Sequence, residues 1–261
     1  MTSPHKGYVD AAYLDTVQSL LSELKRRTYE HMRVQPGHAV LDAGCGPGTD
    51  TVVLARLVNP SGRVVGVDHD ADMIAEAERR ASEAGVAAWV THVQADVTAL
   101  PCPDACFDAC RSERLFEHLR DPAMALSELA RVTKPGGWIV VLDSDWGSFS
   151  MDTPEIDAER RLLRFFTEQV VDNGYSGRQL YRLFKQQGLA DVTAQVCGVP
   201  FTDYALARLV TLMDSCERDA LASGVISAEE LEKMHAWWEQ ADADGLFFAS
   251  MSMILVSGRR L

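Results

Sequence analysis

Along the first 145 residues, short apolar runs alternate with segments whose apolar residues recur every three or four positions. A short apolar run predicts a buried strand, whereas the three-to-four spacing predicts a helix with one apolar face. Strands that alternate with helices through short connections favour a parallel sheet with helices on both faces. The predicted strands are 39–43, 63–67, 89–95, 107–112 and 136–143, and the predicted helices are 9–33, 49–58, 71–84 and 121–133.

The pattern becomes mainly helical after residue 150. Trp237 and Trp238 are adjacent in one predicted helix, so they cannot share a face, and we expect one of them in the core. No repeat or low-complexity linker divides the chain, so residues 1–261 are expected to form a single domain. The elements predicted here are helices 153–172 and 177–187, a strand at 191–199, helices 203–222 and 227–243, and a last strand at 247–257.

Composition narrows the class of protein. The chain has 261 residues, of which 47% are hydrophobic, so it can bury a sizeable core. A formal net charge of −13 argues against binding to nucleic-acid phosphates. No apolar stretch is long enough to span a membrane, and the N-terminus lacks the apolar core of a signal peptide. We therefore expect a cytoplasmic protein.

The six cysteines and seven histidines show no paired spacing typical of a metal site. Cys102, Cys106 and Cys110 recur at every fourth position, but Cys102 lies between two prolines and Cys110 lies in an apolar run. One helical face cannot present all three. We expect reduced and mostly buried thiols, and no metal ion.

The most informative segment is Val40–Thr49, a strand that leads into a turn with glycine at 44, 46 and 48 and then into a helix. Glycine adopts positive φ and lets a ligand approach the backbone, so this unit predicts a nucleotide-type cofactor site. A dinucleotide fingerprint would require glycine at position 49, where this chain has Thr49. A phosphate-binding loop requires lysine, and the chain has none between residues 26 and 133.

Three aspartates stand where strands of this predicted sheet end. Asp42 precedes the glycines, Asp68 ends the second strand and Asp96 follows the third. A carboxylate can accept hydrogen bonds from both hydroxyls of a ribose, which suits Asp68, and Asp96 stands where an adenine amino group could donate.

Four ordered motifs over roughly residues 35 to 145 resemble class I S-adenosylmethionine-dependent methyltransferases, in particular the ubiquinone/menaquinone branch. There is also a general likeness to natural-product enzymes, including azapteridine N-methyltransferases of the toxoflavin type. The motifs are Asp42-x-Gly44-x-Gly46-x-Gly48 with Asp68 and Asp96-Val97, the strand Phe107–Ser112, the segment Leu115–Leu119, and the helix, Pro-Gly-Gly turn and strand of Leu126–Val141.

The resemblance implies an α/β, Rossmann-like, seven-stranded sheet of order 3-2-1-4-5-7-6 whose last strand is antiparallel. Residues 203–243 would form a helical cap between the last two strands, and residues 1–34 a helical lid. S-adenosylmethionine would be the cofactor. The residues expected to bind it are Asp42, Gly44, Cys45, Gly46, Gly48, Thr49, Asp68, His69, Met73, Asp96, Val97, Arg111 and Ser112.

Charged groups at positions 111 and 113 could hold the amino and carboxylate ends of the methionine part, or could form an internal salt bridge that anchors their loop. His118 and Glu113 are the candidate catalytic residues, although a histidine at position 118 could instead pack at the start of the next helix.

The residues expected on the acceptor side are aromatic. Tyr8 and Tyr13 would close a lid over the methyl donor, unless their helix is a simple brace. Trp146 would form an aromatic wall or else pack in the core, and Tyr175 lies in a turn that could bring it to the pocket.

The predicted function is methyl transfer to nitrogen or oxygen of a small planar heteroaromatic metabolite, in bacterial secondary metabolism, mainly by proximity and orientation. The alternatives are C-methylation of a quinone or aromatic precursor, a non-catalytic S-adenosylmethionine-binding protein, and a nicotinamide-dependent reductase, which Thr49 disfavours. The expected partner is a small-molecule acceptor, and the protein would be a monomer or a homodimer.

Overall fold

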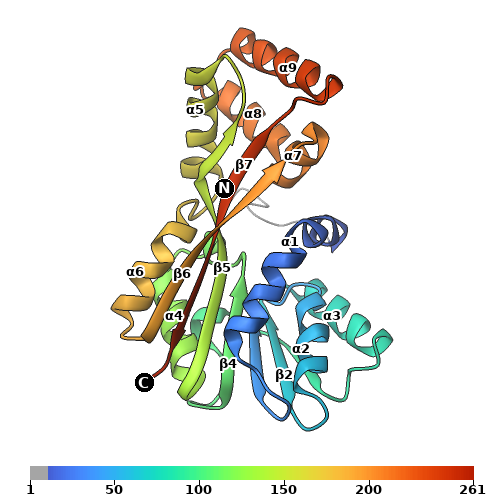
Figure 1. Ribbon diagram of the computed structural model, residues 1–261, viewed down its shortest axis with the longest axis vertical. Coiled ribbons are helices and arrows are strands. Elements are labelled where there is room, and N and C mark those ends of the chain that lie inside the picture. Colours follow the sequence, from blue (N-terminus) through green and yellow to red (C-terminus); the bar gives the residue numbers. More distant parts are fainter. Residues whose placement is uncertain (1–10) are drawn as a thin grey trace.

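The computed structural model describes residues 11–261, and for residues 11–19 it describes the backbone alone. Seven strands form one sheet in the order β3-β2-β1-β4-β5-β7-β6, which confirms the predicted order (Figure 1). β7 runs antiparallel to both β5 and β6, also as predicted. The strands are β1 (Ala39–Ala43), β2 (Arg63–Asp68), β3 (Val90–Gln94), β4 (Phe107–Glu113), β5 (Thr133–Met151), β6 (Ala190–Phe201) and β7 (Ala249–Arg259).

Both faces of this sheet are covered by helices because adjacent residues of a buried strand point to opposite sides. Val40 faces a cluster with Leu21 and Leu54, whereas Leu41 faces a cluster with Leu126 and Phe184. One face is covered by α1 (Ala11–Met32), α2 (Thr49–Val58) and α3 (Ala71–Glu83), and the other by α4 (Pro122–Val132) and α6 (Ser176–Gln186).

The strands β5, β6 and β7 continue beyond the other four into a second lobe (Figure 1). The predicted strand 136–143 proves to be a 19-residue strand, β5, because its polar continuation is also buried. Asp143 accepts hydrogen bonds from the hydroxyl of Ser176 and from the amide of Phe116, at 2.8 Å for the latter. The second lobe also contains α5 (Ile156–Phe165), α7 (Tyr204–Thr211), α8 (Met213–Ala222) and α9 (Ala228–Ala243).

Two predicted helices are interrupted. The helix predicted over 153–172 is α5, which passes at Phe166 into a π-helical turn, Phe166–Val170 (η3). The helix predicted over 203–222 breaks at Leu212, whose φ of 50° is left-handed. No glycine or proline marks either break in the sequence. Two short 3₁₀ turns, η1 (Val97–Ala99) and η2 (Phe116–His118), follow β3 and β4.

None of the helices in the described part of the chain is both long enough and apolar enough to cross a bilayer. The same residues contain no group of three or more histidine, cysteine or acidic side chains placed to hold a metal ion.

The adjacent tryptophans of α9 have opposite environments, as the sequence predicted. Trp238 is fully buried, and its indole N–H donates to the carbonyl of Asp152 at 3.1 Å. Trp237 is 44% exposed. Trp238→Ala should therefore lower the free energy of unfolding by about 3–5 kcal/mol, whereas Trp237→Ala should change it by less than about 0.5 kcal/mol. Denaturant titration of both variants checks this, and equal losses would contradict it.

Candidate active site

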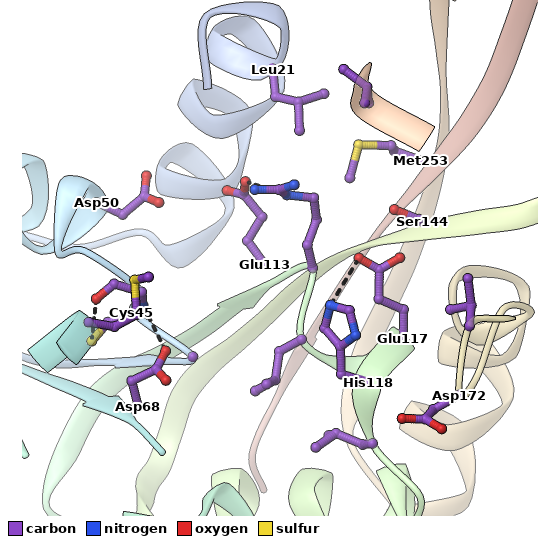
Figure 2. Close-up of a pocket in the computed structure, with 18 of the residues that line it drawn as sticks. Leu21, Cys45, Asp50, Asp68, Glu113, Glu117, His118, Ser144, Asp172 and Met253 are labelled. Carbon is purple, nitrogen blue, oxygen red and sulfur yellow. Dashed lines mark hydrogen bonds and ion pairs between the residues drawn. The ribbon is translucent and has the colours of Figure 1, made fainter. Parts of the chain in front are cut away.

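A cavity of about 520 Å³ opens at the carboxyl ends of β1, β2 and β4, beside the extended strands β5–β7. This volume is typical of small-molecule and cofactor sites. Figure 2 shows Cys45 and Asp68 toward one end of the cavity and Glu117, His118 and Ser144 toward the other. The cavity therefore joins the glycine-rich turn to residues from the second half of the chain.

The glycine-rich turn between β1 and α2 forms one wall. A Cβ at Gly44 would lie 3.1 Å from the side chain of Leu115, and Gly44 has a φ of 72°. Gly48 has a φ of 76°, and a Cβ there would lie 2.7 Å from the Cβ of Ala77. Side chains at these positions would be strained and would disturb the packing that holds the turn. Residues 44–47 of the turn line the cavity, so a cofactor could lie against this backbone.

Asp68, at the end of β2, supports this turn. Its Oδ2 accepts a hydrogen bond from the amide of Gly46 at 2.9 Å, and its Oδ1 accepts one from the amide of Asp70 at 3.0 Å. Each carboxylate oxygen has two lone pairs, so both can accept a further donor from a ligand. Asp68 lines the cavity and is therefore placed to bind a pair of ribose hydroxyls.

Asp96 lies at the end of β3 and also lines the cavity. Its Oδ1 accepts hydrogen bonds from the amide and the hydroxyl of Thr98, at 2.8 and 2.7 Å. These two bonds lower the pKa of the Asp96 carboxyl, which leaves a carboxylate whose second oxygen can accept a hydrogen bond.

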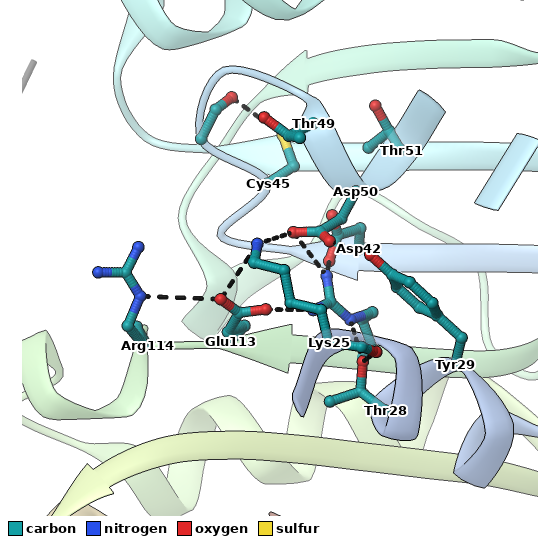
Figure 3. A network of polar contacts seen from close by, with 12 residues as sticks. Lys25, Thr28, Tyr29, Asp42, Cys45, Thr49, Asp50, Thr51, Glu113 and Arg114 are labelled. Carbon is teal, nitrogen blue, oxygen red and sulfur yellow. Dashed lines mark hydrogen bonds and ion pairs between the residues drawn. The ribbon is translucent and has the colours of Figure 1, made fainter. Parts of the chain in front are cut away.

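A network of buried charges lies behind the turn (Figure 3). The guanidinium of Arg111, on β4, is 1% exposed and reaches Asp42 and Asp50, each at 3.1 Å. It also pairs with Glu113, and its Nε donates to the hydroxyl of Thr28 at 3.2 Å. Because these partners occupy the guanidinium, the geometry favours the internal salt bridge over a ligand contact for Arg111.

Lys25, from α1, completes the network. Its Nζ lies 2.7 Å from Asp50 and 3.1 Å from Glu113. Burial opposes ionisation of Asp50, but Arg111 and Lys25 together lower the pKa of its carboxyl. The Asp50 carboxylate also accepts a hydrogen bond from the hydroxyl of Tyr29. Burial dominates at Asp42 and raises the pKa of that carboxyl to about 7. The network ties α1 to the sheet beside the cavity.

A second acidic group lies toward the other end of the cavity. Glu117, in η2, is 5% exposed and accepts a hydrogen bond from the indole N–H of Trp146. Its Oε1 lies 3.6 Å from Nε2 of His118, whose side chain is 42% exposed. Asp143 is fully buried next to this group. Burial, together with the negative charge of Glu117, raises the pKa of the Asp143 carboxyl.

Trp146 is held rigidly in this part of the cavity. Its ring packs edge-to-face against Phe166 and Phe149, with centroids 4.9 and 6.3 Å away. The surrounding wall is apolar, and its residues come from η3, β6, α7 and β7. They include Phe166, Val199, Phe201, Val210, Met251 and Met253.

Most residues predicted to bind the cofactor line the cavity. Asp42, Gly48 and Ser112 do not, because Asp42 and Ser112 are buried within the sheet and Gly48 packs against α3. The predicted residues that line it are Gly44, Cys45, Gly46, Thr49, Asp68, His69, Met73, Asp96, Val97 and Arg111.

The residues predicted on the acceptor side are placed unevenly. Trp146, His118 and Glu113 line the cavity. Tyr175 does not: its hydroxyl donates to Glu168 at 3.1 Å, and Arg178 lies over its ring. Tyr8 lies outside the described residues, as does the side chain of Tyr13.

Six charged lining residues were not predicted from the sequence to lie at the site: Lys25, Asp50, Asp70, Arg114, Glu117 and Asp172. Asp50 is adjacent in sequence to Thr49, and Glu117 is adjacent to His118. Their positions beside predicted site residues could have indicated that they line the cavity. Lys25 had no such signal, because its amphipathic helix carries many charges.

Comparison with known proteins identifies the family. Residues 41–141 match the family model for a methyltransferase domain. The chain is 36% identical to a ubiquinone/menaquinone biosynthesis C-methyltransferase of Cellvibrio japonicus, over 65% of this chain and 71% of that protein. It is 34% identical to an uncharacterised 37.1 kDa protein in transposon TN4556 of Streptomyces fradiae, over 95% of this chain and 70% of that protein.

Solved structures show the same fold at low sequence identity. A putative methyltransferase from Bacillus halodurans C-125 has a TM-score of 0.63 and 18% identity, over 90% of this chain and 98% of that one. The geranyl diphosphate C-methyltransferase of Streptomyces coelicolor A3(2) has a TM-score of 0.59 and 17% identity, over 99% of this chain and 88% of that one. Together with the family match, the glycine-rich turn and the two cavity-lining aspartates place this chain among the class I S-adenosylmethionine-dependent methyltransferases, with S-adenosylmethionine as its methyl donor.

Proposed function

We propose that this enzyme methylates a nitrogen or oxygen atom of a small, planar and largely apolar acceptor, which binds against Trp146. The observation that carries the proposal is that the two ends of this cavity differ in composition. At one end lie the glycine-rich turn and Asp68, and at the other lie the Trp146–Glu117 pair and an apolar wall. A heteroaromatic acceptor and a role in secondary metabolism belong to the same proposal.

In this proposal Asp68 binds the ribose hydroxyls and Asp96 binds the adenine amino group of the cofactor, which lies against the backbone of residues 44–47. S-adenosylmethionine supplies, when bound, a methyl group made electrophilic by its sulfonium. The remaining contribution of the chain is to orient the acceptor and to exclude water, which can account for much of the acceleration of such a transfer.

Glu117 is the residue best placed to take the proton that the acceptor loses. Its Oε2 accepts a hydrogen bond from the indole of Trp146, whereas Oε1 lies 3.6 Å from Nε2 of His118 and accepts no hydrogen bond from the described residues. Glu113 is less suitable because both of its oxygens are paired with cations, Lys25 and Arg111. His118, which is more exposed, would pass the proton to solvent.

C-methylation of a quinone or aromatic precursor is the second candidate. The relatives favour it, since the Cellvibrio japonicus protein is named as a C-methyltransferase in quinone biosynthesis. An aromatic carbon also loses a proton after methyl transfer, so Glu117 would have the same role. The position of the new methyl group in the product distinguishes the two candidates.

The helical segments around the cavity suggest how it closes. α1 contributes Leu20, Leu21 and Lys25 to the cavity, and α7 contributes Val210. We propose that residues 1–34 form a lid, anchored to the sheet through Lys25, and that residues 203–243 act as a cap that selects the acceptor. Within this cap, the cavity is lined by the end of α7 and the break at Leu212 rather than by Tyr204, Trp237 or Trp238.

The cofactor half of the proposal can be tested on Asp68. S-adenosylhomocysteine should bind measurably in calorimetry, whereas nicotinamide dinucleotides should not. Asp68→Ala removes two charge-assisted hydrogen bonds to the ribose, each worth about 1.5–3 kcal/mol, so the affinity should fall well over tenfold. The exposed Asp72 provides the control, because Asp72→Ala removes a carboxylate from the same region without touching the cavity. Tight binding of a dinucleotide, or equal effects of the two variants, would refute this assignment.

Glu117→Gln keeps the size of the side chain and removes its basicity. Turnover should fall about 100-fold or more, since general-base catalysis contributes about 10²–10⁴-fold, while the affinity for S-adenosylhomocysteine stays within about twofold. The assay measures tritiated methyl transfer from S-adenosylmethionine to planar phenols, N-heteroarenes and hydroquinones. Glu168→Gln, outside the cavity, is the matched control. Unchanged turnover in Glu117→Gln would exclude this residue as the base.

Trp146→Ala should raise KM for the acceptor or lower turnover while the cofactor affinity changes little, because the tryptophan faces the acceptor half of the cavity. Trp146→Phe, which keeps an aromatic wall but loses the indole N–H, should have the smaller effect on KM. If Trp146→Ala weakens cofactor and acceptor equally, or only lowers the unfolding temperature, then Trp146 is a core residue and the aromatic-wall hypothesis is wrong.

A further inference from the structure

The methionine part of the cofactor carries a carboxylate, which calls for a cationic partner in the cavity. Among the described residues that line it, the lysine and arginine side chains are Lys25, Arg111 and Arg114. Lys25 is held between Asp50 and Glu113, at 2.7 and 3.1 Å. Arg111 is 1% exposed and surrounded by carboxylates. Neither cation can turn toward a ligand without leaving a buried carboxylate unpaired.

Arg114 differs from both in its pairing. Its side chain is 18% exposed, and its Nε is buried without a hydrogen-bond partner among the described residues. The nearest carboxylate oxygen is Oε1 of Glu113, at 3.7 Å, and that carboxylate is already paired with Lys25 and Arg111. In Figure 3 the guanidinium of Arg114 extends away from the buried network. Of the three cationic side chains named above, Arg114 is therefore the one whose charge remains available to an anionic ligand.

The backbone explains why Arg114 points away from the sheet. Arg114 follows β4 directly and has a φ of 49°, in the left-handed region that non-glycine residues rarely adopt. Its amide still donates to the carbonyl of Leu142 at 2.9 Å, so the chain stays anchored to β5 while it turns. Unfavourable backbone conformations of this kind cluster at ligand sites, where the surrounding structure holds them in place.

The strand order places Arg114 at the correct end of a bound cofactor. Asp68 and Asp96 follow β2 and β3, and the glycine-rich turn follows β1. In the order β3-β2-β1-β4, Arg114 lies on the opposite side of that turn from both aspartates. Contact between the two segments is close, since the side chain of Leu115 lies 3.1 Å from a Cβ built on Gly44. A cofactor whose adenosine lies over β2 and β3 would extend its amino-acid part toward Arg114.

We propose that Arg114 binds the carboxylate of the methionine part of S-adenosylmethionine, and that Arg111 acts only in the buried network behind it. This inference rests on the proposed adenosine site at Asp68 and Asp96. It assigns the two arginines different functions, although they are three residues apart in the sequence. Arg114 would fix the position of the amino-acid part, whereas Arg111 would hold the turn and α1 in place.

The test compares two ligands that differ in the amino-acid part. S-adenosylhomocysteine carries it, whereas 5′-methylthioadenosine lacks it. Calorimetry on the full chain should show that Arg114→Gln lowers the affinity for S-adenosylhomocysteine at least tenfold. The affinity for 5′-methylthioadenosine should change by less than about twofold. Arg114→Lys, which keeps the charge, should recover part of the loss. Arg120→Gln is the control, because it removes the same charge from an exposed position on the same loop, outside the cavity.

Each other outcome has a distinct meaning. Equal weakening of both ligands in Arg114→Gln would show that Arg114 only supports the turn, and unchanged affinities would show that it faces the acceptor or solvent; both overturn the inference. A wild-type chain that binds neither ligand would instead overturn the adenosine site. If Arg114→Gln does not fold, Arg114→Met takes its place, since it also removes the charge, and an unaltered ratio of the two affinities in that variant overturns the inference.

Discussion

The buried guanidinium of Arg111 is the interaction on which the site depends. It lies between Asp42 on β1, Asp50 on α2 and Glu113 on β4. Its Nε also donates a hydrogen bond to Thr28 on α1. A buried charge that loses a partner destabilises a protein strongly, by about 3–5 kcal/mol in measured cases. These elements therefore cannot separate independently, and the glycine-rich turn between β1 and α2 is held in one position relative to β4.

This constraint explains how a short turn and a distant helix form one cavity. α1 packs Leu21, Leu24 and Met32 into the core on this face of the sheet, and its charged anchor beside the cavity is Lys25. Lys25 links it to Asp50 and Glu113, the same carboxylates that Arg111 contacts. The wall that α1 gives to the cavity is thus fixed by the network that also positions the turn. The same charged side chains therefore position the glycine-rich turn and hold α1 against the sheet.

The sheet order followed from the resemblance to the methyltransferase family. Local patterns were enough to predict the glycine-rich turn and the aspartates of the cavity, because each depends on residues close together in sequence. The pairing of Asp42 with Arg111 was not predictable in this way. It arises because the two residues are opposite each other in the register of β1 and β4. Tyr175 was misjudged for a related reason: a turn near the cavity does not fix the direction of a side chain, and this one points to Glu168. The break at Leu212 carries no local signal at all.

Two different segments of the chain line the two ends of the cavity. Under the proposed function, this arrangement separates binding of the methyl donor from selection of the acceptor. The glycine-rich turn, Asp68, Asp96 and Arg114 all lie within residues 41–141, the part that matches the methyltransferase model. Trp146 and the apolar wall come from later residues, carried by the extensions of β5, β6 and β7 and by α7. Under the proposed function, substitutions in the later segment would change the shape of the acceptor half and leave the turn unchanged. Under the proposed function, one donor site could then serve different acceptors, because different segments of the chain supply the turn and the apolar wall.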